Sequence, residues 1–169
     1  LDNALQREET GDTNRIGEEL ANKLTKKSSL DPENKDLYYQ LFKAYLIAGN
    51  LIRAEQTLKS MMKKFPDDYE IRFLLAKTYL GLRRFKDSDK QLKEIILKKA
   101  AEEEAAVLVS TSQALLIVSA YYQGNNKKAA EYSRLWGEVL LDYIPRLRLN
   151  GREAEHLRYI IREIKRDDS

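Results

Sequence analysis

The sequence predicts an all-α fold, an array of antiparallel helix hairpins with about eight to nine helices. Two observations support this prediction. The chain is 43% hydrophobic and 34% charged, but holds only 7 Gly and 3 Pro among 169 residues. That balance is typical of a folded protein with too few turn-forming residues for a β-sandwich or barrel. The sequence also repeats with a period of 34 residues, a length typical of helical repeats.

The repeat becomes visible when the sequence is shifted against itself by 34 residues. Identical residues then align, among them Pro32 with Pro66, Leu41 with Leu75, Tyr45 with Tyr79, and Leu58 with Leu92. One helix hairpin of this length cannot bury its apolar face alone. The period therefore predicts hairpins that stack on one another in a single domain.

The N-terminal unit, residues 1–34, is expected to be a truncated or atypical repeat. A short polar helix over residues 3–9 precedes a longer helix over residues 12–28. The apolar spacing of the longer helix predicts three inward residues, Ile16, Leu20 and Leu24.

Residues 35–68 and 69–102 are predicted to be complete hairpins. In the first, an apolar stripe at i, i+3, i+4 and i+7 marks a helix over residues 36–48: Tyr38, Leu41, Phe42 and Tyr45. Gly49 and Asn50 end that helix, since both tolerate the left-handed conformation. The second helix then runs over residues 51–64 and stops before a proline.

The last two segments depart from the 34-residue register. Gly124 and Asn125 match the turn at residues 49–50 with an offset of 75 instead of 68, so residues 103–145 are read as a degenerate repeat with a lengthened first helix. That helix is expected over residues 101–123, and its partner over residues 126–143 with Trp136 inward. Residues 146–169 are expected to form a C-terminal capping helix.

The repeated positions resemble the tetratricopeptide repeat (TPR). The first copy carries its aromatic, Leu, Tyr, small and Pro positions in order: Tyr38, Leu41, Tyr45, Gly49, Ala54, Leu58 and Pro66. The second copy is similar but ends on Ala100 instead of Pro. The resemblance implies a right-handed superhelical solenoid. It also implies a non-enzymatic protein–protein interaction module that binds a peptide or partner segment in its concave groove, as an adaptor or assembly scaffold.

The concave wall of such an array is made by the first helix of each hairpin. The residues off the packing stripe are expected to face the groove: Asp36, Tyr39, Lys43, Leu46, Ile47, Glu70, Phe73, Lys77 and Leu80, continued by Thr111, Ala114, Val118 and Tyr121 if the third unit keeps register. Lys43 and Lys77 stand 34 residues apart, as do Tyr39 and Phe73. These pairs suit an acidic peptide. The alternative is that the two aromatic residues are partly buried between repeats.

The charge distribution also favours an acidic partner for the middle of the chain. Residues 43–100 hold 14 basic and 7 acidic residues, a net charge of +7. Nucleic-acid binding is less favoured, because basic pairs such as Lys63-Lys64 fall at expected helix ends instead of along one stripe.

No catalytic, metal or cofactor site is predicted. The chain has no Cys and one His, so thiolate chemistry and histidine-rich metal sites are excluded. Glu153 precedes His156 by three residues, as in carboxylate-bridged metal sites, but those sites need a second such pair. His156 is therefore expected to be a surface residue on a charged helix.

The alternative function is that of a spacer or self-association surface within a larger protein, including a homodimer. The longest strongly apolar stretch, Ala114–Tyr122, is shorter than the roughly 20 residues that span a membrane. The sequence therefore predicts a soluble chain without a membrane span or signal peptide. The chain starts at Leu1, which indicates processing or excision from a longer chain. Neither the compartment nor the identity of the partner is predicted.

Overall fold

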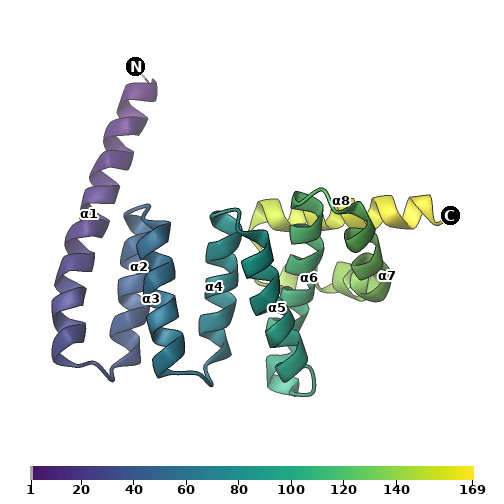
Figure 1. Cartoon of the computed structure of the whole chain (residues 1–169). Helices are drawn as coiled ribbons and strands as arrows, with labels where there is room; N and C mark the ends of the chain where they lie inside the picture. Colours follow the sequence, from purple (N-terminus) through teal and green to yellow (C-terminus); the bar gives the residue numbers. More distant parts are fainter. Residues whose placement is uncertain (1) are drawn as a thin grey trace. The chain divides into compact units, whose positions relative to one another are not determined.

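The fold is helical throughout the described chain. The computed structural model describes residues 2–169, with side chains from residue 11 onward, and this range contains helices but no strand (Figure 1). The elements in chain order are α1 (Asp2–Leu30), α2 (Lys35–Ile47), α3 (Leu51–Lys64), α4 (Tyr69–Gly81), α5 (Phe85–Lys99), η1 (Glu103–Ala105), α6 (Ala106–Tyr122), α7 (Asn126–Tyr143), η2 (Ile144–Arg146) and α8 (Gly151–Asp167). The predicted all-α array of helices is confirmed.

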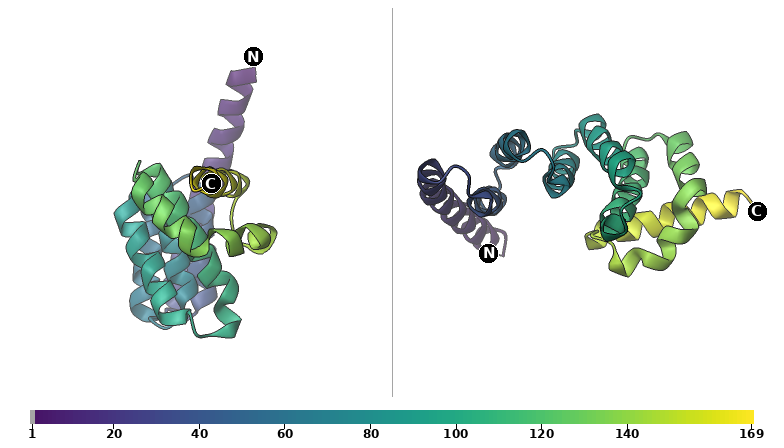
Figure 2. Two further views of the ribbon diagram at one scale, coloured as in Figure 1. Left: turned by 90° about the vertical axis from the view of Figure 1, so that its right-hand side faces the viewer. Right: turned by 90° about the horizontal axis from the view of Figure 1, so that it is seen from below.

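The helices form two compact units, residues 1–82 and residues 83–169, each described here by itself. The boundary lies between α4 and α5, within the predicted repeat at residues 69–102. Seen from below, the helices of the first unit follow one another in a zigzag (Figure 2). Its core is made by residues of α1 to α4: Ala21, Leu24, Leu41, Phe42, Ala44, Tyr45, Ala54, Leu58, Met61, Ile71, Leu75 and Tyr79.

The predicted helix breaks are present, and left-handed residues form them. Gly49 and Gly124 have φ values of +69° and +71°, and Arg83 takes the same conformation with φ +59° at the position 34 residues after Gly49. Asn50 and Asn125 then cap the next helices, because each side chain accepts a hydrogen bond from a backbone N–H three residues on, at 3.1 Å. The left-handed conformation therefore recurs one period after Gly49 although the residue is an arginine, and Gly124 with Asn125 repeats the Gly-Asn turn outside the 34-residue register.

Helix α1 differs from its prediction in two ways. It is one continuous helix from Asp2 to Leu30, where two helices were expected. Gly11 lies inside it, since a single glycine costs a helix only about 1 kcal/mol relative to Ala.

The inward face of α1 differs from the predicted one at two of the three predicted residues, whereas Leu24 is buried as expected. Ile16 and Leu20 are 57% and 40% exposed, and the buried stripe consists of Gly17, Ala21, Leu24 and Ser28. A Cβ atom at Gly17 would lie only 2.8 Å from both the Ala44 carbonyl oxygen and the Ala48 Cα of α2. Small residues therefore let the two helix backbones approach closely, and the larger apolar residues are displaced to the side.

Helix α6 begins later than predicted, and neighbouring helices surround it. The chain before it forms the 3₁₀ turn η1, so the helix starts at Ala106 instead of at residue 101. It packs against α5, α7 and α8. Contrary to the expectation that they line a groove, three of its residues are therefore buried core residues: Thr111, Ala114 and Val118.

The packing of α6 also explains its apolar composition. Residues 103–122 are the one stretch of the described chain that is long and apolar enough to cross a membrane, with a mean hydropathy of 1.5. However, 56% of this stretch is buried inside the protein, as expected of a core helix. Helix α8 packs on α6 with one apolar face, whose residues Leu157, Ile160 and Ile161 are buried.

Candidate partner-binding surface

Helix α2 presents one basic and two apolar side chains to solvent. Lys43 is exposed, and Leu46 and Ile47 are each 42% exposed. Residues three and four apart lie on one face of a helix, so these three side chains form a continuous surface. The equivalent residues of α4 are less accessible, since Lys77 and Leu80 are half-buried.

Phe73 does not belong to this surface. Its side chain is 1% exposed, and the Lys77 ammonium lies 6.0 Å from the centre of its ring. The expectation that Phe73 faces a partner is therefore corrected, and the alternative reading of a buried aromatic residue holds for it. The periodic spacing alone could not distinguish the two, because a repeat residue between neighbouring helices has the same spacing as one in a groove.

Tyr39 is half-buried and joins α2 to the start of α4. Its hydroxyl donates to Asp68 Oδ2 at 2.8 Å, and the Lys35 ammonium donates to the same oxygen at 3.1 Å. Asp68 is the N-cap of α4, since its Oδ1 accepts from the Glu70 backbone N–H at 3.1 Å. Tyr39 therefore holds consecutive hairpins together, and its hydroxyl is already occupied.

The environment of Asp68 changes its acidity. Partial burial raises the pKa of its carboxyl, but hydrogen bonds from Tyr39 and Lys35, the charge of Lys35 and the Glu70 N–H together lower it below its ordinary value. Because the folded pKa is below the unfolded one, the carboxylate stabilises the fold above the unfolded pKa. That contribution is lost as the pH falls through the folded value.

We expect Asp68→Asn to lower the midpoint of urea unfolding at pH 7, because the neutral amide loses the charge that Tyr39, Lys35 and the α4 N-terminus stabilise. The difference from wild type should shrink as the pH falls below about 3.9, where the wild-type carboxyl becomes protonated in the unfolded chain and then in the folded one. The neighbouring exposed Asp67 offers the control Asp67→Asn, which should change little. A deficit of Asp68→Asn that stays constant across this pH range would exclude the charged network.

Tyr121, the candidate from the third predicted repeat, lies in the second unit and is 38% exposed. Its ring lies 6.1 Å from the ring of His156 and 6.3 Å from that of Tyr159, both on α8. It therefore belongs to an aromatic group that the sequence did not predict.

His156 is half-buried instead of being a free surface residue. Its Nδ1 is hydrogen-bonded to the Tyr122 hydroxyl at 2.7 Å, and burial raises the pKa of that phenol above its ordinary value. Glu153, which has metal-site spacing from His156, is buried and caps α8: it accepts from the Asn150 N–H at 2.9 Å. Within residues 11–169, no group of three or more His, Asp or Glu side chains could hold a metal ion.

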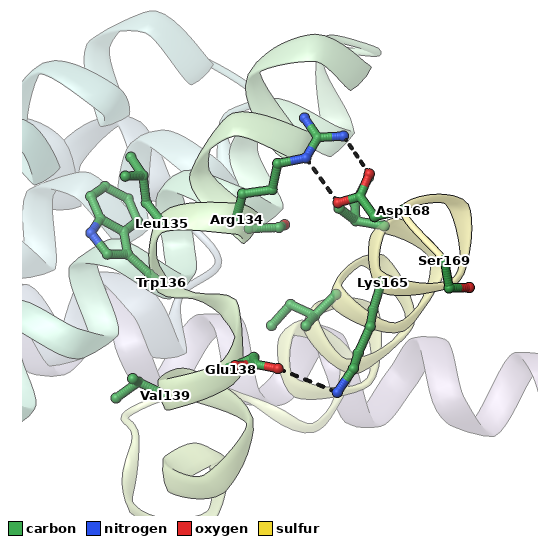
Figure 3. A pocket seen from close by; sticks show the side chains of 11 residues that line it. Arg134, Leu135, Trp136, Glu138, Val139, Lys165, Asp168 and Ser169 are labelled. Atoms are coloured by element: carbon green, nitrogen blue, oxygen red, sulfur yellow. Dashed lines mark hydrogen bonds and ion pairs between the residues drawn. The ribbon is translucent and has the colours of Figure 1, made fainter.

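The sequence analysis also missed a cleft in the second unit. A cavity of about 480 Å³ lies beside α7 and α8, with apolar lining from Trp136, Leu135 and Val139. Figure 3 shows the two ion pairs that join the helices there: Arg134 with Asp168 at 2.9 Å, and Lys165 with Glu138 at 3.3 Å. Trp136 was expected to point inward, but it is half-buried and stacks on Tyr132 at 5.2 Å between ring centres.

Comparison with known proteins agrees with this architecture. The family model described as tetratricopeptide repeat matches residues 45–110. A similar solved structure is a crystal structure from Podosopora anserina, of nearly identical TPR-like repeats in a protein assigned as a kinesin light chain. It has a TM-score of 0.57 and 15% sequence identity, and the alignment covers 98% of this chain and 96% of that chain.

At 15% sequence identity, the structural similarity shows the fold but does not identify a binding partner. No curated protein sequence matches the chain. Tetratricopeptide repeats generally mediate protein–protein interaction and are typically non-catalytic. The resemblance that the sequence predicts is thereby confirmed: residues 45–110 match the tetratricopeptide repeat model, and the all-α repeat fold is of the same kind as that of the similar structure.

Proposed function

We propose that the chain is a non-enzymatic adaptor or assembly scaffold that binds an acidic segment of a partner protein. The binding surface, called the groove face below, consists of Lys43, Leu46 and Ile47 on α2 with Lys77 and Leu80 on α4. The observation that carries the proposal is the exposure of two large apolar side chains beside a lysine on the first helix of a TPR-like hairpin.

The chemistry of the groove face supports an acidic, partly apolar ligand. Leu46 and Ile47 each leave 42% of their surface in contact with water, which a bound apolar side chain would cover. Lys43 is one helical turn away from both and offers an ammonium group to a carboxylate. Lys77 and Leu80 occupy the equivalent positions 34 residues later in the sequence. A bound segment would therefore contact a lysine beside a leucine on both α2 and α4.

The test is a change of charge on the groove face. We expect the double variant Lys43→Glu with Lys77→Glu to bind peptides selected from a displayed random library on the wild-type chain about tenfold more weakly or worse. Fluorescence anisotropy with labelled peptides measures the affinity. The unfolding midpoint should stay close to that of the wild type, because Lys43 is exposed and Lys77 is half-exposed.

The matched control is Lys63→Glu with Lys93→Glu, which changes the net charge equally on the second helices α3 and α5, where both lysines are exposed. If the two double variants lose affinity equally, the loss is caused by the overall charge of the protein, and a binding site on the groove face is contradicted.

A second candidate function, self-association, is favoured by one observation on α7. Leu135, Val139 and Tyr143 follow one another at intervals of four residues and are 70%, 63% and 46% exposed. Such an apolar stripe suits contact with another protein surface. Sedimentation velocity over a range of chain concentrations reports this alternative directly.

A further inference from the structure

Helix α1 contributes side chains to the same face of the first unit as α2. The two helices come into close contact at Gly17, where a Cβ atom would meet the backbone of Ala44 and Ala48. The residue just before Gly17 is Ile16, and the residues just before Ala44 and Ala48 are Lys43 and Ile47. Their relative position follows from helix geometry.

Two antiparallel right-handed helices in contact are related by a local two-fold axis perpendicular to both. This axis exchanges the two helices, but each side chain stays on the same side of the plane that contains both helix axes. A residue of α1 and a residue of α2 that each come one position before a contact residue therefore lie on the same side of that plane. Since α1 and α2 are antiparallel (Figure 1), Ile16 lies on the same side as Lys43 and Ile47.

The same rule applies along the whole buried stripe of α1. The residues that precede Ala21, Leu24 and Ser28 are Leu20, Lys23 and Lys27, and all three are exposed. On this side, α1 carries an apolar end with Ile16 and Leu20 and a basic end with Lys23 and Lys27, and α2 carries Lys43 and Ile47. Two exposed acidic residues also lie on this side: Asp12, one helical turn before Ile16, and Asp36 on α2.

Close packing merges these side chains into one surface. With glycine and alanine at the contact, the backbones of α1 and α2 approach until Cβ would lie 2.8 Å from the Ala48 Cα. Ile16 and Leu20 of α1 therefore lie beside the row formed by Lys43 and Ile47 of α2. A valley between two packed helices is the shape into which a third helix fits.

We propose that α1 forms an additional wall of the groove face and that the bound segment is an acidic amphipathic helix of a partner protein. Its apolar side chains cover Ile16, Leu20 and Ile47, and its carboxylates pair with Lys23, Lys27 and Lys43. The inference rests on the proposed function, since it places the partner on the same face. It adds the conformation of the ligand and a helix that the predicted groove did not include.

The length of α1 supports a helical ligand. It has 29 residues and α2 has 13, about 43 Å and 20 Å at 1.5 Å per residue. Figure 1 shows α1 extending well past the end of α2. The part of α1 that lies beside the 13 residues of α2 is about 20 Å long, which is enough for between three and four turns of a bound helix.

The test uses peptides of about 20 residues, long enough to form a helix, selected from a displayed random library on the intact chain. We expect selected peptides to be acidic, with apolar residues at i, i+3 or i+4, and to gain helical circular dichroism when bound. The variant Ile16→Glu with Leu20→Glu should bind them about tenfold more weakly or worse. The milder variant Ile16→Ser with Leu20→Ser removes the apolar side chains without adding charge and should also weaken binding. It keeps the test valid if the Glu variant fails to fold.

The control is Asn22→Glu with Ser29→Glu, which adds the same charge at exposed positions on another side of α1 and should bind as the wild type does. Peptides that lose affinity for Lys43→Glu with Lys77→Glu, but not for the α1 variants, would overturn the role of α1 and leave the proposed function standing. If the selected peptides bind both sets of variants as tightly as the wild type, or if the selection yields no peptide, both the role of α1 and the proposed function are overturned. Dimerisation that Ile16→Glu with Leu20→Glu abolishes would show a second copy as the occupant and overturn the partner helix.

Discussion

Gly17→Ala is expected to destabilise the first unit by about 3 kcal/mol or more, at the upper end of the usual cost of overpacking. The added methyl group would lie 2.8 Å from the Ala44 carbonyl oxygen and from the Ala48 Cα, and closer still to the Ala48 nitrogen. All three are backbone atoms, of Ala44 in α2 and of its C-cap residue Ala48, so no side-chain rotation relieves the clash and α1 must move as a whole. Urea unfolding followed by circular dichroism measures the loss, and hydrogen exchange localises it to α1 and α2.

The chain contains a matched control in the same helix. A Cβ atom at Gly11 would meet nothing within 4 Å, and alanine favours a helix by about 1 kcal/mol over glycine. Gly11→Ala should therefore leave the protein equally stable or more stable. If both glycine variants unfold alike, the close contact between α1 and α2 is not present in solution.

The contact at Gly17 also explains what the sequence could and could not predict about α1. Hydrophobic periodicity assigns the largest apolar residues to the core, so Ile16 and Leu20 were predicted to point inward. Helix pairs that pack closely instead place their smallest residues at the contact, and here Gly17 and Ala21 occupy it. A pattern based on hydrophobicity gives glycine no weight, so Ile16 and Leu20 were wrongly placed inward, whereas the third predicted residue, Leu24, is buried as expected.

Elements fixed by local chemistry were predicted well. The turns at Gly49 and Gly124 need left-handed residues followed by a capping asparagine, and both features are visible in the sequence. The stripe of α2 was likewise predicted, because Leu41, Phe42 and Tyr45 face two neighbours fixed by the repeat itself.

Contacts that depend on distant segments were not predictable. Thr111, Ala114 and Val118 were placed in a groove because the repeat register assigns them there. The packing of α8 on α6 is not part of that register. The same limit applies to the cleft at α7, whose lining combines residues 133–139 with residues 161–169. On the candidate site, the exposure of Lys43, Leu46 and Ile47 agrees with the prediction, whereas Phe73 does not.

Phe73→Ala is expected to lower the free energy of unfolding by about 3–5 kcal/mol, the usual cost of removing a large buried side chain. Phe73 is among the largest side chains with almost no exposed surface. Its truncation removes apolar contacts and leaves a cavity that rigid helices fill only in part. Urea unfolding at pH 7 measures the effect, and Phe73→Leu, which keeps most of the volume, should recover the larger part of it.

Leu46→Ala separates this structural role from a binding role. Leu46 is 42% exposed, so its truncation should cost less stability than Phe73→Ala but should weaken the binding of selected peptides. The two variants are thus expected to rank in opposite order for stability and for affinity per folded molecule. Were Phe73→Ala as stable as wild type and deficient only in binding, the ring would have to be accessible to the partner. The groove would then extend along α4, and the structure of this part of the first unit would differ in solution.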